Sequence, residues 1–276
     1  MNSTPQYTAM QGIALLTLCR FAAFLTDSAG YTAPLALGTF LAVCSQILLA
    51  VCLLKMRPLR VPRPLSAIAA VLWAGTLCLR LHRLLTVLHA PVPTVTLALM
   101  LVTVYLLLRH PPAATARAAA LLLIVTAAGL LLLPVSGIGT AEPVFLHLRD
   151  SVSEGFLRAW AISGDMLLLL PVLRRAESKA AAHTILTGWG IGCGIILPGI
   201  ILLGTMQNGR LRDFGGAPFF LMLSRTPLSD AVRTDGFWLL LAVGLTALSA
   251  VFLIESTKPM QNDYASPSHR RFICRK

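Results

Sequence analysis

The chain contains eight stretches of about twenty mostly apolar residues, the length that crosses the roughly 30 Å hydrocarbon layer of a membrane as a helix. They lie at residues 9–28, 33–54, 66–88, 93–109, 116–135, 156–173, 182–205 and 236–254. The composition agrees, since 56% of the residues are hydrophobic and 12% are charged, against about 45–50% and 25% in soluble domains. We therefore expect an all-α polytopic membrane protein with about eight transmembrane helices, forming a single membrane domain over residues 1–255.

Basic residues are concentrated in every second connection between these segments. The fourteen that lie there or in the C-terminal tail, of 23 in total, are Lys55, Arg57, Arg60, Arg63, Arg109, Arg117, Arg174, Arg175, Lys179, Lys258, Arg270, Arg271, Arg275 and Lys276. The other connections hold most of the carboxylates, namely Asp27, Glu142, Asp150, Glu154, Asp213, Asp230 and Asp235. By the positive-inside rule both termini are expected in the cytoplasm, which requires an even number of spans. The net charge of +12 is thus explained by membrane orientation, and no nucleic-acid partner is expected.

Two connections on the less basic side, 136–155 and 206–235, are longer than a link between helices requires. The second contains the apolar run 217–223, which is too short to cross a membrane. It is expected to form either a re-entrant or surface-lying helix over an entrance, or a hydrophobic loop resting on the helix ends. The polar, basic tail 256–276 is expected to be disordered.

Ionisable side chains in the middle of apolar segments are costly to insert and are therefore candidates for function. Arg20 lies near the middle of the first segment and Asp165 near the middle of the sixth, which predicts an ion pair. Such a pair either receives a ligand or only fixes how two helices pack. Ser163 and Gly164 precede Asp165 and favour a broken helix, a feature that often presents helix ends to a substrate's carboxylate or ammonium group.

The third segment carries Arg80 and Arg83 on one helical face, with Thr76 about one turn below Arg80. The two guanidinium groups could bind an anionic group in an outward vestibule, or extend to the lipid headgroups, as we expect for Arg83. His82 points elsewhere and is expected to bond to a neighbouring helix.

The seventh segment is rich in glycine between Gly188 and Gly194, which predicts close helix packing. The cysteines have no metal-ligand spacing, and no catalytic motif is found. We expect no enzymatic activity, metal or cofactor.

Three stretches carry a family resemblance. They are Arg80-Leu81-His82-Arg83 through Val92-Pro93-Thr94 to Tyr105, Arg109 and Ala116-Arg117-Ala118; Gly164-Asp165-Met166 to Pro171; and Pro218 to Arg225 followed by Arg233-Thr234-Asp235 and Trp238. With this spacing, residues 9–255 resemble the B subunits of bacterial spore-germination receptors, which are amino-acid-permease-like proteins of the amino acid–polyamine–organocation superfamily.

The resemblance implies two inverted five-helix repeats, with the first and sixth segments broken beside a midplane pocket that the third and eighth complete. On this basis we expect a ligand site of Arg20, Asp165, Ser163, Gly164, Thr76 and Arg80, in which Arg20 meets a carboxylate and Asp165 an ammonium group. The family has ten spans and this chain has eight predicted ones, so the second repeat is expected to be incomplete. The first segment also carries Arg20 where such permeases usually have glycine.

Three functions remain as alternatives. The first is a germinant-sensing subunit in a bacterial cell membrane or spore inner membrane, with an amino-acid-like ligand, lipid and other receptor subunits as partners. The second is an amino-acid transporter of the same superfamily. The third is a ligand-free scaffold in which Arg20 and Asp165 only pack.

Overall fold

The computed structural model describes residues 6–27, 30–55, 63–88, 93–110, 112–137, 139, 141–143, 146, 151–208, 217–224 and 235–256. Nearly all of these residues are helical, and none of them forms a strand beyond one isolated bridge. The helices are α1 Ala9–Leu25, α2 Ala33–Lys55, α3 Arg63–Val87, α4 Pro93–Arg109, α5 Pro112–Gly137, α6 Val152–Ile162, α7 Met166–Arg174, α8 Lys179–Ile191, η3 Gly192–Ile196 (a π-helical segment), α9 Leu197–Asn208, α10 Pro218–Ser224 and α12 Asp235–Ser256.

Each of the eight predicted segments is occupied by helix. Within the described ranges, five helices are long and apolar enough to cross a membrane, at Ala33–Leu54, Ala67–Val87, Ala113–Leu130, Lys179–Gln207 and Gly236–Glu255. The pair α6 and α7 makes a sixth if it is counted as one span bent by 57°. α1 and the Thr96–Arg109 part of α4 are shorter apolar helices. The described residues therefore contain five or six helices able to span a membrane.

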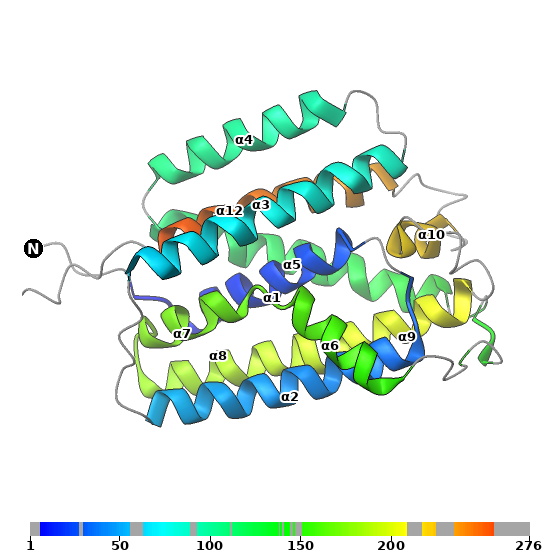
Figure 1. Ribbon diagram of the computed structural model, residues 1–276, viewed down its shortest axis with the longest axis horizontal. Coiled ribbons are helices and arrows are strands. Elements are labelled where there is room, and N and C mark those ends of the chain that lie inside the picture. Colours follow the sequence, from blue (N-terminus) through cyan, green and yellow to red (C-terminus); the bar gives the residue numbers. More distant parts are fainter. Residues whose placement is uncertain are drawn as a thin grey trace, which may run out of the picture.

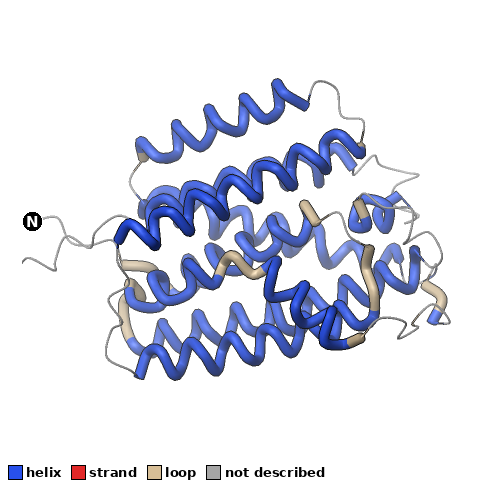
Figure 2. The backbone as a smooth tube through the Cα atoms, in the orientation of Figure 1, coloured by secondary structure: helices blue, strands red, loops and turns tan. Residues whose placement is uncertain are grey.

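The helices lie along a common direction, and successive ones run back and forth (Figure 1). α1 packs against α5, α8 and α12, while α4 lies at one edge against α3 and α12. α1 buries residues around its whole circumference, as a helix that is apolar on all sides does. The tube view shows the interruption between α6 and α7 as a loop within the helical layers (Figure 2).

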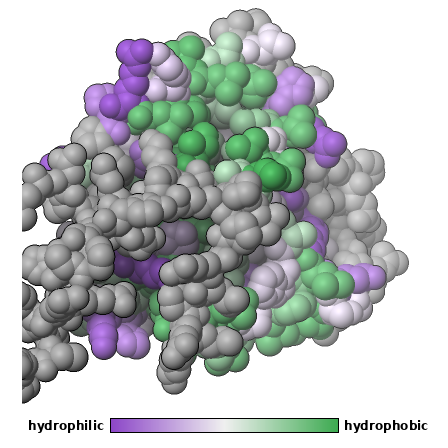
Figure 3. Space-filling view, turned by 60° about the vertical axis from the view of Figure 1, so that its left-hand side comes forward, coloured by the Kyte–Doolittle hydropathy of each residue, from purple (hydrophilic) through white to green (hydrophobic). Residues whose placement is uncertain are grey.

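Large apolar side chains are exposed along the outer helices. Leu48, Ile68, Leu72, Leu121 and Leu240 are each more than half exposed. Figure 3 shows hydrophobic side chains beside hydrophilic ones on the face turned towards the viewer. Exposed apolar helix faces of this kind are expected of a membrane protein, in which lipid covers them.

The alternating helix directions bring basic positions to one end of the bundle, which we call the basic end. α2 ends at Lys55, α4 at Arg109 and α7 at Arg174, while α8 begins at Lys179, all at this end (Figure 1). The segment before α1 is fastened here, because the Tyr7 amide donates to the Arg175 carbonyl at 2.8 Å and the Glu177 amide donates to the Tyr7 carbonyl at 3.1 Å. Burial raises the pKa of the Tyr7 phenol above 10.0.

The apolar run 217–223 forms most of the short helix α10 and does not form a loop. Phe219 is buried and contacts Trp238 of α12 edge-on at 5.0 Å and Phe21 of α1 at 6.1 Å. This helix thus packs its aromatic side chains into the bundle. Most of the predicted long connections 136–155 and 206–235, and the tail after Ser256, lie outside the described residues.

Glycines on the seventh predicted segment allow the close helix packing that the sequence predicts. A Cβ added at Gly188 would come within 2.5 Å of Ile13, and one at Gly192 within 3.1 Å of Thr17, both on α1. On another face, Gly190 and Gly194 lie against α2. Two pairs of small residues spaced four apart therefore fit this helix against α1 and α2 at once.

Candidate functional site

The candidate site is built around the interruption between α6 and α7. α6 ends at Ile162 and α7 begins at Met166, and the Ser163 hydroxyl donates to the Ala159 carbonyl within the last turn of α6. Gly164 is required by packing, since a Cβ there would lie 1.6 Å from an atom of the Trp73 ring. The predicted break is therefore present in the sixth segment. The corresponding break that the resemblance implies for the first segment is absent, because α1 is continuous from Ala9 to Leu25.

Asp165 lies in this break and forms the predicted ion pair with Arg20. Arg20 Nε and Asp165 Oδ1 are 2.7 Å apart, and the two residues are 2% and 3% exposed. Inside a protein the loss of hydration of both charges is offset only when geometry is good and other hydrogen bonds complete the pair. Two further side chains supply those bonds.

Gln46 of α2 and Trp189 of α8 complete the pair, and both are fully buried. Arg20 Nη2 donates to Gln46 Oε1 at 2.6 Å, and Trp189 Nε1 donates to Asp165 Oδ2 at 3.0 Å. The Arg20 guanidinium also lies over the Trp189 ring at 5.6 Å, a favourable cation–π arrangement. The site thus joins α1, α2, α8 and the α6–α7 break.

Neither Gln46 nor Trp189 was predicted from the sequence as a site residue. The signal for Gln46 was available, because an amide in the middle of an apolar helix normally faces another helix and bonds to it. The buried Gln46 Nε2 has no hydrogen-bond partner among the described residues. A donor without an acceptor therefore lies beside the Arg20 guanidinium.

The remaining predicted site residues lie on α3, apart from the ion pair. Thr76 is exposed, and its hydroxyl donates to the Trp73 carbonyl of its own helix. Arg80 is half-buried and lies over the Trp73 ring at 5.7 Å. Since Trp73 contacts Gly164, Arg80 is connected to the break through that tryptophan, whereas Thr76 is not brought to it. Arg83 is exposed, and its extension to the headgroups stays a prediction.

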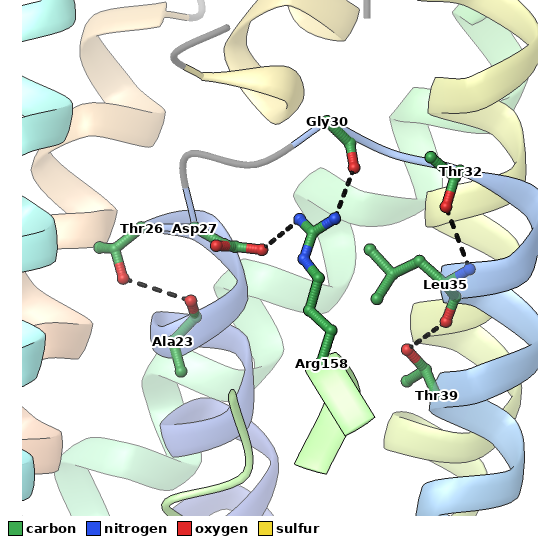
Figure 4. Close-up of polar contacts among 8 residues, drawn as sticks. All are labelled: Ala23, Thr26, Asp27, Gly30, Thr32, Leu35, Thr39 and Arg158. Carbon is green, nitrogen blue, oxygen red and sulfur yellow. Dashed lines mark hydrogen bonds and ion pairs between the residues drawn. The ribbon is translucent and has the colours of Figure 1, made fainter. Parts of the chain in front are cut away.

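A second Arg–Asp pair lies at the end of the bundle opposite the basic end (Figure 4). Arg158 of α6 extends between the end of α1 and the start of α2, with its Nη2 2.6 Å from Asp27 Oδ2 and its Nη1 3.0 Å from the Gly30 carbonyl. The Arg158 and Asp27 side chains are 27% and 13% exposed. From the sequence, Asp27 was expected only as one of several carboxylates on the less basic side, and Arg158 was not predicted to have a role.

We expect Trp189→Phe to lower the free energy of unfolding in detergent by about 1.5–3 kcal/mol, the contribution of a hydrogen bond to a charged group. The substitution keeps an aromatic ring but leaves Asp165 Oδ2 without its donor. Trp160→Phe is the matched control, because the buried Trp160 Nε1 has no partner among the described residues. Equal effects of the two substitutions would show that the hydrogen bond to Asp165 does not matter.

No group of three or more His, Cys, Asp or Glu residues that could hold a metal ion occurs in the described part of the chain. Comparison of the chain with protein-family models, curated proteins and solved structures finds no match.

Proposed function

We propose that the chain is a membrane-embedded binding subunit that recognises a small zwitterion, such as an amino acid, between Arg20 and Asp165. The observation that carries this proposal is the position of the pair. The two opposite charges meet at a helix break, beside the buried Gln46 Nε2, which has no hydrogen-bond partner in the described part of the chain. A pair that served packing alone would need neither the interruption of the helix nor an extra donor.

In the bound state the ligand replaces the direct contact between the two side chains. Its carboxylate accepts from the Arg20 guanidinium and from Gln46 Nε2, for which the described residues supply no acceptor. Its ammonium group donates to Asp165, whose orientation is held by Trp189 Nε1. The end of α6 adds partial negative charge for the ammonium, and the start of α7 adds partial positive charge for the carboxylate.

The family resemblance suggests the role of such a site. On that basis the chain is a germinant-sensing subunit of a spore-germination receptor, with about eight spans in an inverted-repeat bundle whose second repeat is incomplete. The protein lies in a bacterial cell membrane or a spore inner membrane, and its basic end faces the cytoplasm. Ligand binding separates Arg20 from Asp165, and the resulting movement of α6 and α7 against α1 is passed to partner subunits.

We expect at least one of the twenty common amino acids to raise the thermal unfolding midpoint of the protein in mild detergent. A ligand at 100 times its Kd stabilises a protein by about 2.7 kcal/mol, enough for a measurable shift. The shift should disappear in Arg20→Ala and persist in Arg174→Ala, a control with an exposed arginine at the basic end.

Three outcomes separate the alternatives. An equal shift in Arg20→Ala would place the ligand elsewhere and contradict the proposed site. No shift with any amino acid would favour the ligand-free scaffold. If binding is found, accumulation of the same amino acid in proteoliposomes would identify a transporter, whereas binding without accumulation would support a sensor.

A further inference from the structure

Two Arg–Asp pairs connect the same two helical segments in opposite sense. In the inner pair, α1 supplies Arg20 and the break after α6 supplies Asp165. In the outer pair, α6 supplies Arg158 and the turn after α1 supplies Asp27. In both segments the aspartate follows the arginine by seven positions. Two antiparallel segments with equal spacing can form both pairs at once, and seven helical residues separate them by about 10 Å.

The two segments are also alike in their local structure. Residues 20–27 read RFAAFLTD and residues 158–165 read RAWAISGD, which share the arginine, one alanine and the aspartate. Each arginine lies within a helix, and each aspartate lies just beyond the last residue of that helix, after Leu25 in one case and after Ile162 in the other. The contact therefore has a local two-fold character, because each segment supplies one arginine and one aspartate and pairs with the aspartate and the arginine of the other segment.

Other packing does little to fix α6 against α1. α6 packs mainly on α2, where the backbones of Gly155 and Gly38 meet, while α1 packs on α5, α8 and α12. The two ion pairs are therefore the main polar links between α1 and the α6 segment among the described residues. Arg158 also bonds to the Gly30 carbonyl, which ties the connection between α1 and α2 to the same point.

The two pairs differ in their surroundings. The inner side chains are 2% and 0% exposed, and the outer ones 27% and 13%. A fully buried pair tolerates little error in geometry, because a mispaired buried charge is strongly destabilising. A partly hydrated pair forms at lower cost and can set the alignment that the buried pair requires.

We propose that Asp27 and Arg158 are a positioning pair, which fixes the rotation and depth of α6 so that Asp165 reaches Arg20. This role deepens the proposed function, because it identifies what holds the ligand-binding charges in register. The first test of the positioning role needs no ligand, so failure of that role can be distinguished from failure of the binding proposal.

The test is a double-mutant cycle on the complete chain in detergent, using Asp27→Asn and Asp165→Asn. Sites this far apart with no shared partner normally act independently, so their effects on the unfolding equilibrium constant multiply to within about twofold. If the outer pair positions the inner one, the unfolding equilibrium constant of the double variant should be at least fivefold lower than the value that this product gives. The reason is that once Asp165 is neutral there is no buried pair left to align. A double-variant unfolding equilibrium constant within twofold of the multiplied value would overturn the proposal.

Exchange of the two outer charges provides a second measurement. Asp27→Arg together with Arg158→Asp should restore most of the stability lost in Asp27→Asn, together with any amino-acid-induced thermal shift that Asp27→Asn reduces. Glu154→Gln, an exposed acid on α6, should leave both quantities unchanged. A swapped variant as unstable as Asp27→Asn would contradict positioning by charge pairing. If no amino acid stabilises the native protein, the stability readout alone decides.

Discussion

Asp165→Ala is expected to lower the free energy of unfolding by about 3–5 kcal/mol, the cost of removing one partner from a buried ion pair. Arg20 is 2% exposed in the native protein, and the substitution leaves its guanidinium with Gln46 Oε1 as the only remaining acceptor among the described residues. It also leaves the Trp189 indole donor without the carboxylate. Denaturation in detergent, followed by tryptophan fluorescence or circular dichroism, measures the loss.

Replacement of both charges should behave differently. Arg20→Met combined with Asp165→Leu removes the uncompensated charge, and apolar replacements of buried pairs are often neutral or stabilising. We expect the double variant to regain most of the stability lost in Asp165→Ala while failing to respond to any amino acid. A double variant no more stable than the single one would show that the charges themselves are needed for folding.

Gly155→Ala is expected to cost about 3 kcal/mol, the upper part of the usual range for overpacking. A Cβ at Gly155 would lie 2.2 Å from the Pro34 carbonyl oxygen, and one at Gly38 would lie 2.2 Å from the Gly155 carbonyl carbon. Both obstacles are backbone atoms, so no rotation of a side chain can relieve them. α6 must therefore move away from α2, and Arg158 and Asp165 move with it.

Gly75→Ala is the matched control, because a Cβ at Gly75 of α3 meets no atom of the described residues within 4 Å, apart from its own neighbours and the backbone of its helix. There the gain in helix propensity, up to about 1 kcal/mol, should dominate. The two alanine substitutions should thus change stability in opposite directions. If Gly155→Ala were neutral, the close contact of α2 and α6 would not be a feature of the folded protein.

The site residues that could be predicted from the sequence are those whose side chains cost the most free energy to place in a membrane. A charged residue in an apolar helix is so costly that Arg20 and Asp165 could be paired without any knowledge of the fold, and Gly164 marked the break. The glycines at 188–194 likewise predicted close packing. These signals are local, or depend only on depth in the membrane.

Features that depend on three-dimensional neighbours could not be predicted. Whether Trp189 faces Asp165 or lipid depends on the rotation of α8, which apolar periodicity does not fix in a helix with few polar residues. The role of Arg158 depends on the antiparallel alignment of α6 with α1. The break implied for the first segment is absent because residues 9–25 contain no mid-segment glycine and helix formers continue through Arg20.

The most direct test of ligand recognition is exchange of the two inner charges, Arg20→Asp with Asp165→Arg, followed by thermal unfolding with and without the amino acid that stabilises the native protein. We expect the swapped protein to remain folded, with some loss of stability because Trp189 can no longer donate to a carboxylate. We also expect it to show no ligand-induced shift, since the surrounding donors and helix ends fix the direction of the zwitterion. A shift equal to that of the native protein would contradict recognition at this site and would identify Arg20 and Asp165 as a packing pair.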